Sequence, residues 1–182
     1  MNLTKNELVK LITDQLEIIS KISLSHNYPI THVKPHGALN NMACESIEIS
    51  LVIAETIKQF CQDLIFIVLP TTKMETAAKK IQLKYACEVF ADRNYQDNGQ
   101  LIPRSKVNSL VLDPKTASKN ILKMLNESSI ISYSGKKIKC DIDTICIHGD
   151  NKNALILAKE LKTLLSMNNY NFLNLNKLAK FN

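Results

Sequence analysis

The chain has 182 residues, of which 45% are hydrophobic and 22% are charged, and its formal net charge is +6. This length and composition are typical of one globular domain that buries a substantial core. No apolar run approaches the roughly 20 residues that a membrane-spanning helix needs, and the N-terminal residues do not have the layout of a signal peptide. We therefore predict a cytoplasmic protein without a membrane partner.

The positive charge does not predict a nucleic-acid partner. Lysines are scattered in short pairs such as Lys79-Lys80, with no basic run and no interleaved aromatic residues. The two arginines, Arg93 and Arg104, fall within one segment. A planar guanidinium suits bidentate binding of a carboxylate or phosphate, so both are candidate ligand-binding residues. The structural alternative for either one is a clamp that holds a loop.

Residues 4–27 are predicted to form a capped helix. Thr4 and Glu7 stand at the spacing of a capping box. The following apolar positions have the spacing of one buried face: Leu8, Leu11, Ile12, Leu16, Ile19 and Ile22. A short strand is expected at residues 30–34, ended by Pro35, and a second helix at residues 45–60.

The middle of the chain continues the alternation of strands and helices. The continuous apolar run at residues 64–69 is typical of a parallel strand covered on both faces. A third helix is expected up to about residue 83, and a short strand at residues 87–91. The periodicity then fails over residues 92–109, which are polar and predict a long loop of the kind that is often functional.

The last third contains two further helices. Asp113-Pro114 predicts the start of a fourth helix, with proline at its first position. Residues 128–139 are expected to form a small β excursion around Gly135. A strand is predicted at residues 143–147, and the last clear helix at residues 151–167.

The order of these elements predicts the fold class. One helix is followed by four strand–helix units, a pattern that predicts an α/β fold with a parallel sheet and right-handed crossovers. We expect a single domain over residues 1–167 and a loosely ordered tail over residues 168–182. In such folds the active site lies at the carboxyl ends of the strands.

Five polar residues stand at such strand ends: His36, Asp92, Arg93, His148 and Asp150. Both histidines precede a glycine, which lets the backbone turn sharply and approach a ligand closely. Each histidine is predicted to be a general acid or base, and the alternative is a hydrogen bond that closes the loop. No close-spaced ligand pair supports a metal site, so none is predicted.

His32 and Lys34 are expected on the same face of the first strand, because side chains alternate along a strand. A lysine that faces a protein interior is costly unless a carboxylate or a ligand pairs with it. Glu88, Asp92 and Asp150 are candidate partners. The functional interpretation is that Lys34 holds a substrate carboxylate or stabilises an oxyanion, and the alternative is a buried structural ion pair.

Three strings together resemble a known family. They are His-Val-Lys-Pro-His-Gly-Ala-Leu-Asn-Asn at 32–41, Glu-Val-Phe-Ala-Asp-Arg-Asn-Tyr at 88–95 with Leu-Ile-Pro-Arg-Ser at 101–105, and Asp-Thr-Ile-Cys-Ile-His-Gly-Asp at 143–150. Their order and separation resemble the LamB/YcsF family over nearly the whole chain, up to about residue 165. The resemblance implies an incomplete (β/α) barrel of the glycoside hydrolase/deacetylase type, built from parallel βα repeats.

The resemblance also implies an activity. It is the ATP-dependent hydrolysis of 5-oxo-L-proline to L-glutamate, in a complex with 5-oxoprolinase subunits B and C. ATP would be a co-substrate, bound with a divalent metal as Mg-ATP, although the sequence has no glycine-rich phosphate loop. We assign catalytic roles to Lys34, His36, His148 and Asp150. We assign substrate or phosphate binding to His32, Glu88, Asp92, Arg93 and Arg104.

The chain departs from the family pattern at its N-terminus. Family members begin with further strand–helix units that carry Asp-Leu-Asn-x-Asp-x-Gly-Glu, Gly-Phe-His-Ala-Gly-Asp and Gly-Ala-His-Pro stretches, which do not occur here. We therefore expect a truncated chain: half of a split enzyme whose missing strands a separate chain supplies, an inactive remnant, or a partner-binding module. A further alternative is a metal-dependent amide hydrolase or deacetylase on the same scaffold.

Overall fold

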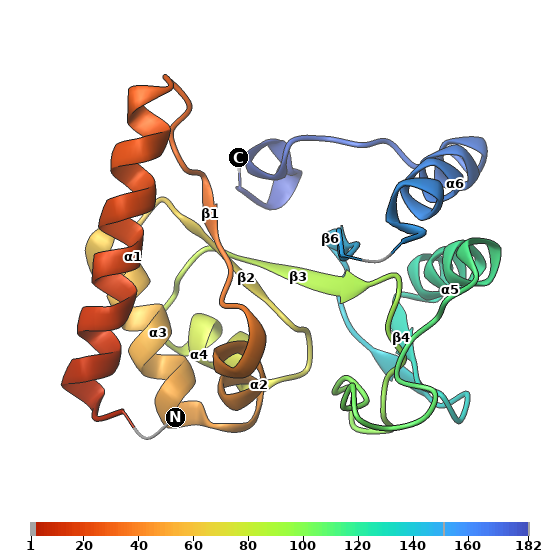
Figure 1. Ribbon diagram of the computed structural model, residues 1–182, viewed down its shortest axis with the longest axis horizontal. Helices are drawn as coiled ribbons and strands as arrows, with labels where there is room; N and C mark the ends of the chain where they lie inside the picture. The colour runs from red at the N-terminus through yellow and green to blue at the C-terminus, as the bar shows by residue number, and fades with distance from the viewer. Residues whose placement is uncertain (1–2, 151, 182) are drawn as a thin grey trace. The chain divides into compact units, whose positions relative to one another are not determined.

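The computed structural model describes residues 3–150 and 152–181. The chain forms two compact units, and Figure 1 labels most of their helices and strands. Unit 1 extends to Ala86 and includes Phe181, and unit 2 covers Cys87–Lys180. Within the described ranges, no helix combines the length and the apolar character that crossing a lipid bilayer requires.

Unit 1 opens with the predicted capped helix. The Thr4 hydroxyl accepts a hydrogen bond from the Glu7 backbone N–H, and the Glu7 carboxylate accepts one from the Thr4 N–H at 2.8 Å. The elements of unit 1 are α1 (Lys5–Ser25), β1 (His32–Val33), α2 (Gly37–Glu45), α3 (Ile47–Phe60), β2 (Ile65–Val68) and α4 (Lys73–Lys80).

Helix α1 packs against α3 (Figure 1), but the buried residues of α1 lie only in its N-terminal part. Leu8, Ile12 and Leu16 are buried, whereas Ile19 is 47% exposed and Ile22 is 50% exposed. The prediction that Ile19 and Ile22 continue the buried face is therefore wrong. Helical spacing determines which side chains share a face, whereas burial also requires a packing partner along the whole face.

The second helical segment is two helices rather than one. The predicted helix at residues 45–60 is confirmed from Ile47 onward as α3, but α2 was not predicted. Ser46 separates the two helices because its backbone is extended, with φ −109° and ψ 121°. Its N–H donates to the Met42 carbonyl that ends α2, and its hydroxyl accepts from the Ile49 N–H at the start of α3.

Both predicted strands of unit 1 are present, but β1 covers only His32–Val33 of the predicted residues 30–34. β1 pairs with β2 in parallel, with His32 opposite Ile65. All four residues of β2 are buried, which confirms a strand covered on both faces. The Phe66 N–H donates to the Lys84 carbonyl at 2.8 Å, just before the next strand begins.

Unit 2 contains the second pair of parallel strands. Its elements are β3 (Tyr85–Phe90, which begins at the end of unit 1), α5 (Pro114–Glu127), β4 (Ser129–Ile131), β5 (Lys137–Lys139), β6 (Thr144–Cys146), α6 (Ala154–Met167) and the short 3₁₀ helices η1 (Leu175–Lys177) and η2 (Ala179–Phe181, whose last residue belongs to unit 1). β3 pairs with β6 in parallel, with Glu88 opposite Thr144 and Phe90 opposite Cys146. β4 and β5 are antiparallel, which confirms the predicted excursion around Gly135.

The core of unit 2 lies between β3 and two helices. Helices α5 and α6 pack side by side (Figure 1). Their inner faces bury Ile121, Leu157, Leu161 and Leu165 against Val89 of β3. This packing fixes the direction of β3 and therefore the position of the residues that follow it.

The C-terminal segment of unit 2 is bonded to the core at two points. The Tyr170 hydroxyl donates to the Asn126 side chain at 2.9 Å, and the Lys180 ammonium lies 2.6 Å from an Asp143 carboxylate oxygen. That oxygen also accepts from the Cys87 N–H at 2.7 Å. The segment, β6 and α6 line much of an open, largely apolar pocket of about 820 Å³.

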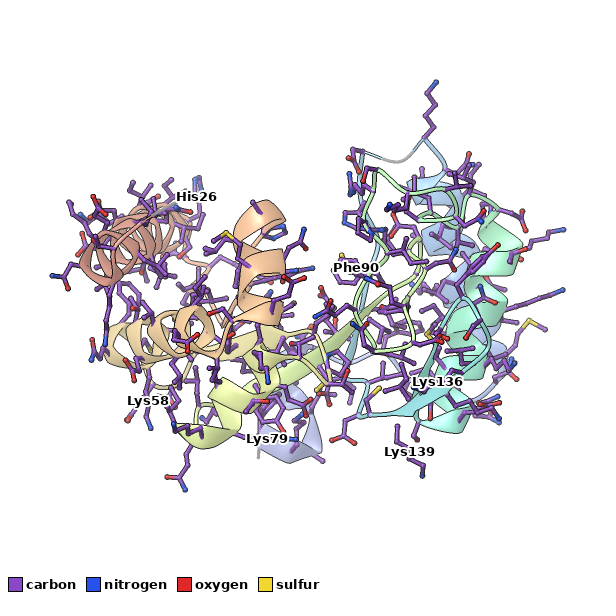
Figure 2. All side chains as sticks on the ribbon, turned by 90° about the horizontal axis from the view of Figure 1, so that it is seen from below. His26, Lys58, Lys79, Phe90, Lys136 and Lys139 are labelled. Atoms are coloured by element: carbon purple, nitrogen blue, oxygen red, sulfur yellow. The ribbon has the colours of Figure 1, made fainter. Side chains whose placement is uncertain are left out.

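Two lysines of unit 1 make local side-chain contacts at α4. Figure 2 labels Lys58, Lys79 and Lys136, which stand on α3, on α4 and beside β5. The Lys58 ammonium donates to the Ile81 carbonyl, and Lys79 pairs with Glu75 one helical turn away at 2.7 Å. The first contact ties the C-terminal end of α4 to α3, whereas the second lies within α4.

Candidate active site

The ends of β3 and β6 bring Asp92 and His148 together. Phe90 and Cys146 are opposite each other in the parallel pair, and the Ala91 N–H donates to the Cys146 carbonyl at 3.0 Å. Asp92 and His148 each follow two residues later, so they are neighbours at the carboxyl edge of the two strands. Both Asp92 carboxylate oxygens lie 2.9 Å from Nδ1 of His148. We call this pair the dyad.

The two side chains of the dyad differ in their exposure to solvent. The Asp92 side chain is 2% exposed, whereas the His148 side chain is 25% exposed. A carboxylate can only accept hydrogen bonds, so Nδ1 of His148 carries the proton that the two share. The other ring nitrogen, Nε2, is then free of this bond and can exchange a proton with a ligand. A histidine oriented by a buried carboxylate is a common arrangement for general acid–base chemistry.

Phe90 and Tyr95 support the dyad from within the unit. The Phe90 ring stacks on the His148 ring, with centroids 5.3 Å apart and an interplanar angle of 21°. The Phe90 N–H donates to the Tyr95 hydroxyl at 2.7 Å, and Tyr95 is fully buried. Neither residue was among the predicted site residues. Strand alternation, which places Phe90 on the same face as Asp92, was the available signal for Phe90.

Arg93 holds the loop that follows β3. Its side chain is buried, and its guanidinium donates to the Ser109 carbonyl at 3.2 Å and to the Ile102 carbonyl at 2.6 Å. Burial lowers the pKa of this guanidinium, the nearby Arg104 lowers it further, and Asp92 opposes the shift. These contacts are those of the loop clamp, which is the structural alternative for this residue.

Arg104 and Asp150 are more accessible. One guanidinium nitrogen of Arg104 lies 3.8 Å from an Asp150 oxygen, and the two side chains are 55% and 73% exposed. An ion pair this exposed contributes little to stability, roughly 0–1 kcal/mol. Both charged groups therefore stay available to a ligand near the end of β6.

Unit 2 thus holds six of the nine predicted site residues. Five of them are at or beyond the carboxyl ends of its strands, in the dyad, at Arg93 and in the Arg104–Asp150 pair. The sixth, Glu88, lies buried within β3. The clustering of these five follows from the register of β3 with β6 and from the fold of the loop between residues 92 and 111.

The other three predicted residues belong to unit 1. His32 is exposed on β1, and its Nδ1 lies 2.9 Å from the Thr31 hydroxyl. Lys34 follows β1 and is half-buried. His36 is exposed at the N-terminus of α2 and makes no side-chain capping bond. It precedes Gly37, whose φ of +59° is a left-handed conformation that favours glycine. The roles assigned to these residues stay predictions.

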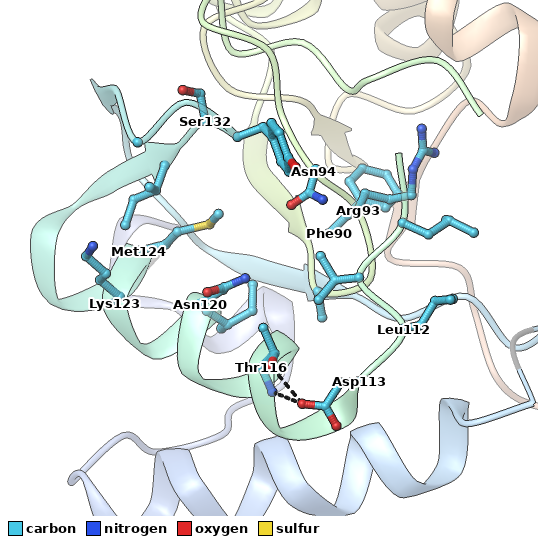
Figure 3. A pocket seen from close by; sticks show the side chains of 17 residues that line it. Phe90, Arg93, Asn94, Leu112, Asp113, Thr116, Asn120, Lys123, Met124 and Ser132 are labelled. Atoms are coloured by element: carbon cyan, nitrogen blue, oxygen red, sulfur yellow. Dashed lines mark hydrogen bonds between the residues drawn. The ribbon is translucent and has the colours of Figure 1, made fainter. Parts of the chain in front are cut away.

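A cavity of about 510 Å³ lies in unit 2 beside the end of β3 (Figure 3). Phe90 and Arg93 line it from β3 and its loop, and Asn120 and Lys123 line it from α5. Neither member of the dyad is among its lining residues. The candidate site therefore rests on the dyad and not on this cavity. Among the residues that the structure describes, no group of three His, Cys, Asp or Glu side chains is arranged to hold a metal ion.

The sequence matches the model of the LamB/YcsF family over residues 1–180. The chain belongs to the LamB/YcsF family. Among curated relatives, the A subunit of 5-oxoprolinase from Staphylococcus haemolyticus is 37% identical over 91% of this chain. The protein of the same name from Clostridium beijerinckii is 35% identical over 98% of this chain and 70% of its own length. This LamB/YcsF chain spans 66% of the length of the Staphylococcus protein.

A solved structure confirms the predicted fold class of this LamB/YcsF chain. The lactam utilization protein from Thermus thermophilus matches it with a TM-score of 0.84 and 34% identity. The match covers 93% of this chain and 67% of the Thermus chain. The α/β class with parallel βα repeats is therefore established on both the sequence and the structure of relatives.

Proposed function

We propose that this LamB/YcsF chain supplies the acid–base dyad for ATP-dependent hydrolysis of 5-oxo-L-proline to L-glutamate. The proposed setting is a complex with 5-oxoprolinase subunits B and C. The names of the relatives, a 5-oxoprolinase A subunit and a lactam utilization protein, support a hydrolase that acts on a cyclic amide. The observation that carries the proposal is the contact of both Asp92 oxygens with Nδ1 of His148 at the carboxyl edge of β3 and β6.

The chemistry needs both an activated carbonyl and a proton carrier. A lactam carbonyl resists attack by water, and transfer of the γ-phosphoryl group of ATP to its oxygen releases ADP and makes the ring carbon electrophilic. Water then adds to that carbon, the C–N bond breaks, and γ-glutamyl phosphate forms. A second water releases phosphate, so that one ATP and two waters yield glutamate, ADP and phosphate.

In this scheme His148 moves protons and Asp92 orients it. Nε2 of His148 takes a proton from the attacking water and returns it to the departing ring nitrogen. Asp92 fixes the ring orientation and stabilises the imidazolium that forms in between. Because the phosphorylated ring bears negative charge, Arg104 is proposed to bind its phosphate or carboxylate oxygens. Arg93 keeps the loop that carries Arg104 in place.

The test is an assay of glutamate formation from 5-oxo-L-proline by the full chain. It is run with the chain alone and together with subunits B and C from the same organism, each with and without ATP. Glutamate that depends on ATP and on the added subunits is the expected result. Glutamate that forms without ATP but requires a divalent metal would instead favour an amide hydrolase or deacetylase. No product in any combination would contradict the proposal and favour a partner-binding chain.

A further inference from the structure

The end of β3 is held by a side chain that takes no part in the proposed chemistry. Tyr95 is fully buried and belongs to the core of unit 2. Its backbone is fixed on both sides, because it bridges to Leu101 in an antiparallel manner and its carbonyl accepts from the Tyr133 N–H at 2.8 Å. Its hydroxyl therefore has a defined position within the unit.

That hydroxyl accepts a hydrogen bond from the Phe90 backbone N–H at 2.7 Å. Phe90 is the last residue of β3, and Asp92 follows it by two residues. The Phe90 ring in turn stacks on His148. One hydroxyl is thus connected to the dyad by two routes: through the backbone to Asp92 and through the Phe90 ring to His148.

The Tyr95 hydroxyl keeps its proton while it accepts the hydrogen bond from Phe90. Burial raises the pKa of the Tyr95 phenol well above its ordinary value, so the hydroxyl is neutral near neutral pH. A buried backbone N–H that loses its acceptor is costly, and the chain shifts to recover a partner. A shift at Phe90 would move the ring that covers His148.

We infer that Tyr95 is a positioning residue, whose hydroxyl fixes the end of β3 and, through Phe90, the orientation of the His148 ring. The inference rests on the proposed function for its catalytic consequence, but its structural consequence stands apart from activity. The Tyr95 hydroxyl acts on the dyad only indirectly, through its hydrogen bond to the Phe90 backbone N–H. Its removal should therefore change the rate of the chemical step more than the binding of the substrate.

The test compares Tyr95→Phe with the matched control Tyr133→Phe in the full chain. Tyr133 is 61% exposed, so its hydroxyl is not part of the buried network. The first readout is the imidazole nitrogen resonances of His148 by NMR across a pH titration. We expect Tyr95→Phe to shift these resonances and the titration midpoint, and Tyr133→Phe to leave both unchanged. A folded Tyr95→Phe chain with an unaltered His148 titration would overturn the inference.

The second readout is the steady-state rate with subunits B and C and ATP. Tyr95→Phe is expected to lower kcat about tenfold and to change KM by less than about twofold. If Tyr95→Phe does not fold, Phe90→Leu carries the NMR test, because it removes the stacked ring and keeps the backbone bond to Tyr95. An unchanged His148 titration in Phe90→Leu would also overturn the inference. If the wild-type complex makes no glutamate, the proposed function fails while the NMR comparison still decides the role of Tyr95.

Discussion

Asp92 places both of its carboxylate oxygens at 2.9 Å from Nδ1 of His148, although the two residues are 56 positions apart in the sequence. The contact follows from the parallel register of β3 and β6, which puts Phe90 opposite Cys146 and the two side chains two residues further on. The Asp92 carboxylate is almost fully buried, and both of its oxygens contact the same ring nitrogen. The histidine ring therefore has one favoured orientation.

Replacing Asp92 by Asn is expected to lower kcat of the assembled enzyme by about 10²–10⁴-fold. An amide can donate to Nδ1 and so favours the wrong tautomer of His148, which would place the proton on Nε2. The tautomer is measured by NMR at a pH at which the imidazole is neutral, alongside the glutamate assay. The control is Asp141→Asn, on an exposed side chain of the same unit. Equal rates for Asp92→Asn and wild type would contradict this role.

Replacing Arg93 by Lys is expected to destabilise the loop that follows β3. An ammonium group cannot reach both the Ser109 and the Ile102 carbonyls. The expected loss is about 1–3 kcal/mol in the free energy of unfolding, measured with urea, because the buried Ser109 carbonyl and the partly buried Ile102 carbonyl lose a charged partner. Arg104→Lys is the control and is expected to change stability by less than about 0.5 kcal/mol. Equal losses in the two variants would show that Arg93 does not clamp the loop.

The N-terminal cap of α5 should make stability depend on pH. Hydrogen bonds from the Thr116 hydroxyl and backbone N–H hold the pKa of Asp113 below its ordinary value (Figure 3). A lowered pKa in the folded state stabilises the fold above the unfolded pKa of about 4, and this contribution is lost as the pH falls through the folded pKa. Asp113→Ala should therefore lower the urea midpoint at neutral pH, and by less at about pH 3. A difference that does not shrink on acidification would contradict the cap.

The cysteines of unit 1 should differ in reactivity. Burial raises the pKa of the Cys44 thiol to about 11, whereas Cys61 is exposed. At about pH 8, iodoacetamide is expected to label Cys61 and to leave Cys44 largely unmodified, because the thiolate is the reactive form. Peptide mass spectrometry measures both sites, and labelling in urea is the control, in which both react. Equally fast labelling of Cys44 in the folded chain would show that the site is open to solvent.

Local signals in the sequence predict much of the fold. The capping box at Thr4, the apolar run of β2 and the Asp113-Pro114 start of α5 are encoded within a few residues, and all three are confirmed. Helix α2 was missed because it is only nine residues long and ends where α3 begins, at Ser46. The exposure of Ile19 could not be predicted, since it depends on where a packing partner ends.

The sequence pointed to both residues of the dyad but not to their contact. The rule that active sites lie at the carboxyl ends of parallel strands selected Asp92 and His148. Their direct contact depends on the register of two strands that are far apart in the sequence, which no local pattern specifies. The contacts of Arg93 likewise depend on the course of a long loop. Tyr95 was missed as a site residue because its hydroxyl acts on a backbone group rather than on a ligand.

The most direct test of the central claim is the rate of glutamate formation by His148→Gln in complex with subunits B and C, at saturating ATP and 5-oxo-L-proline. Glutamine keeps a polar side chain near Asp92 but cannot carry a proton between water and the ring nitrogen. We expect kcat to fall at least about 10²-fold, with KM within about threefold of wild type. A His148→Gln enzyme that turns over at the wild-type rate would contradict the claim.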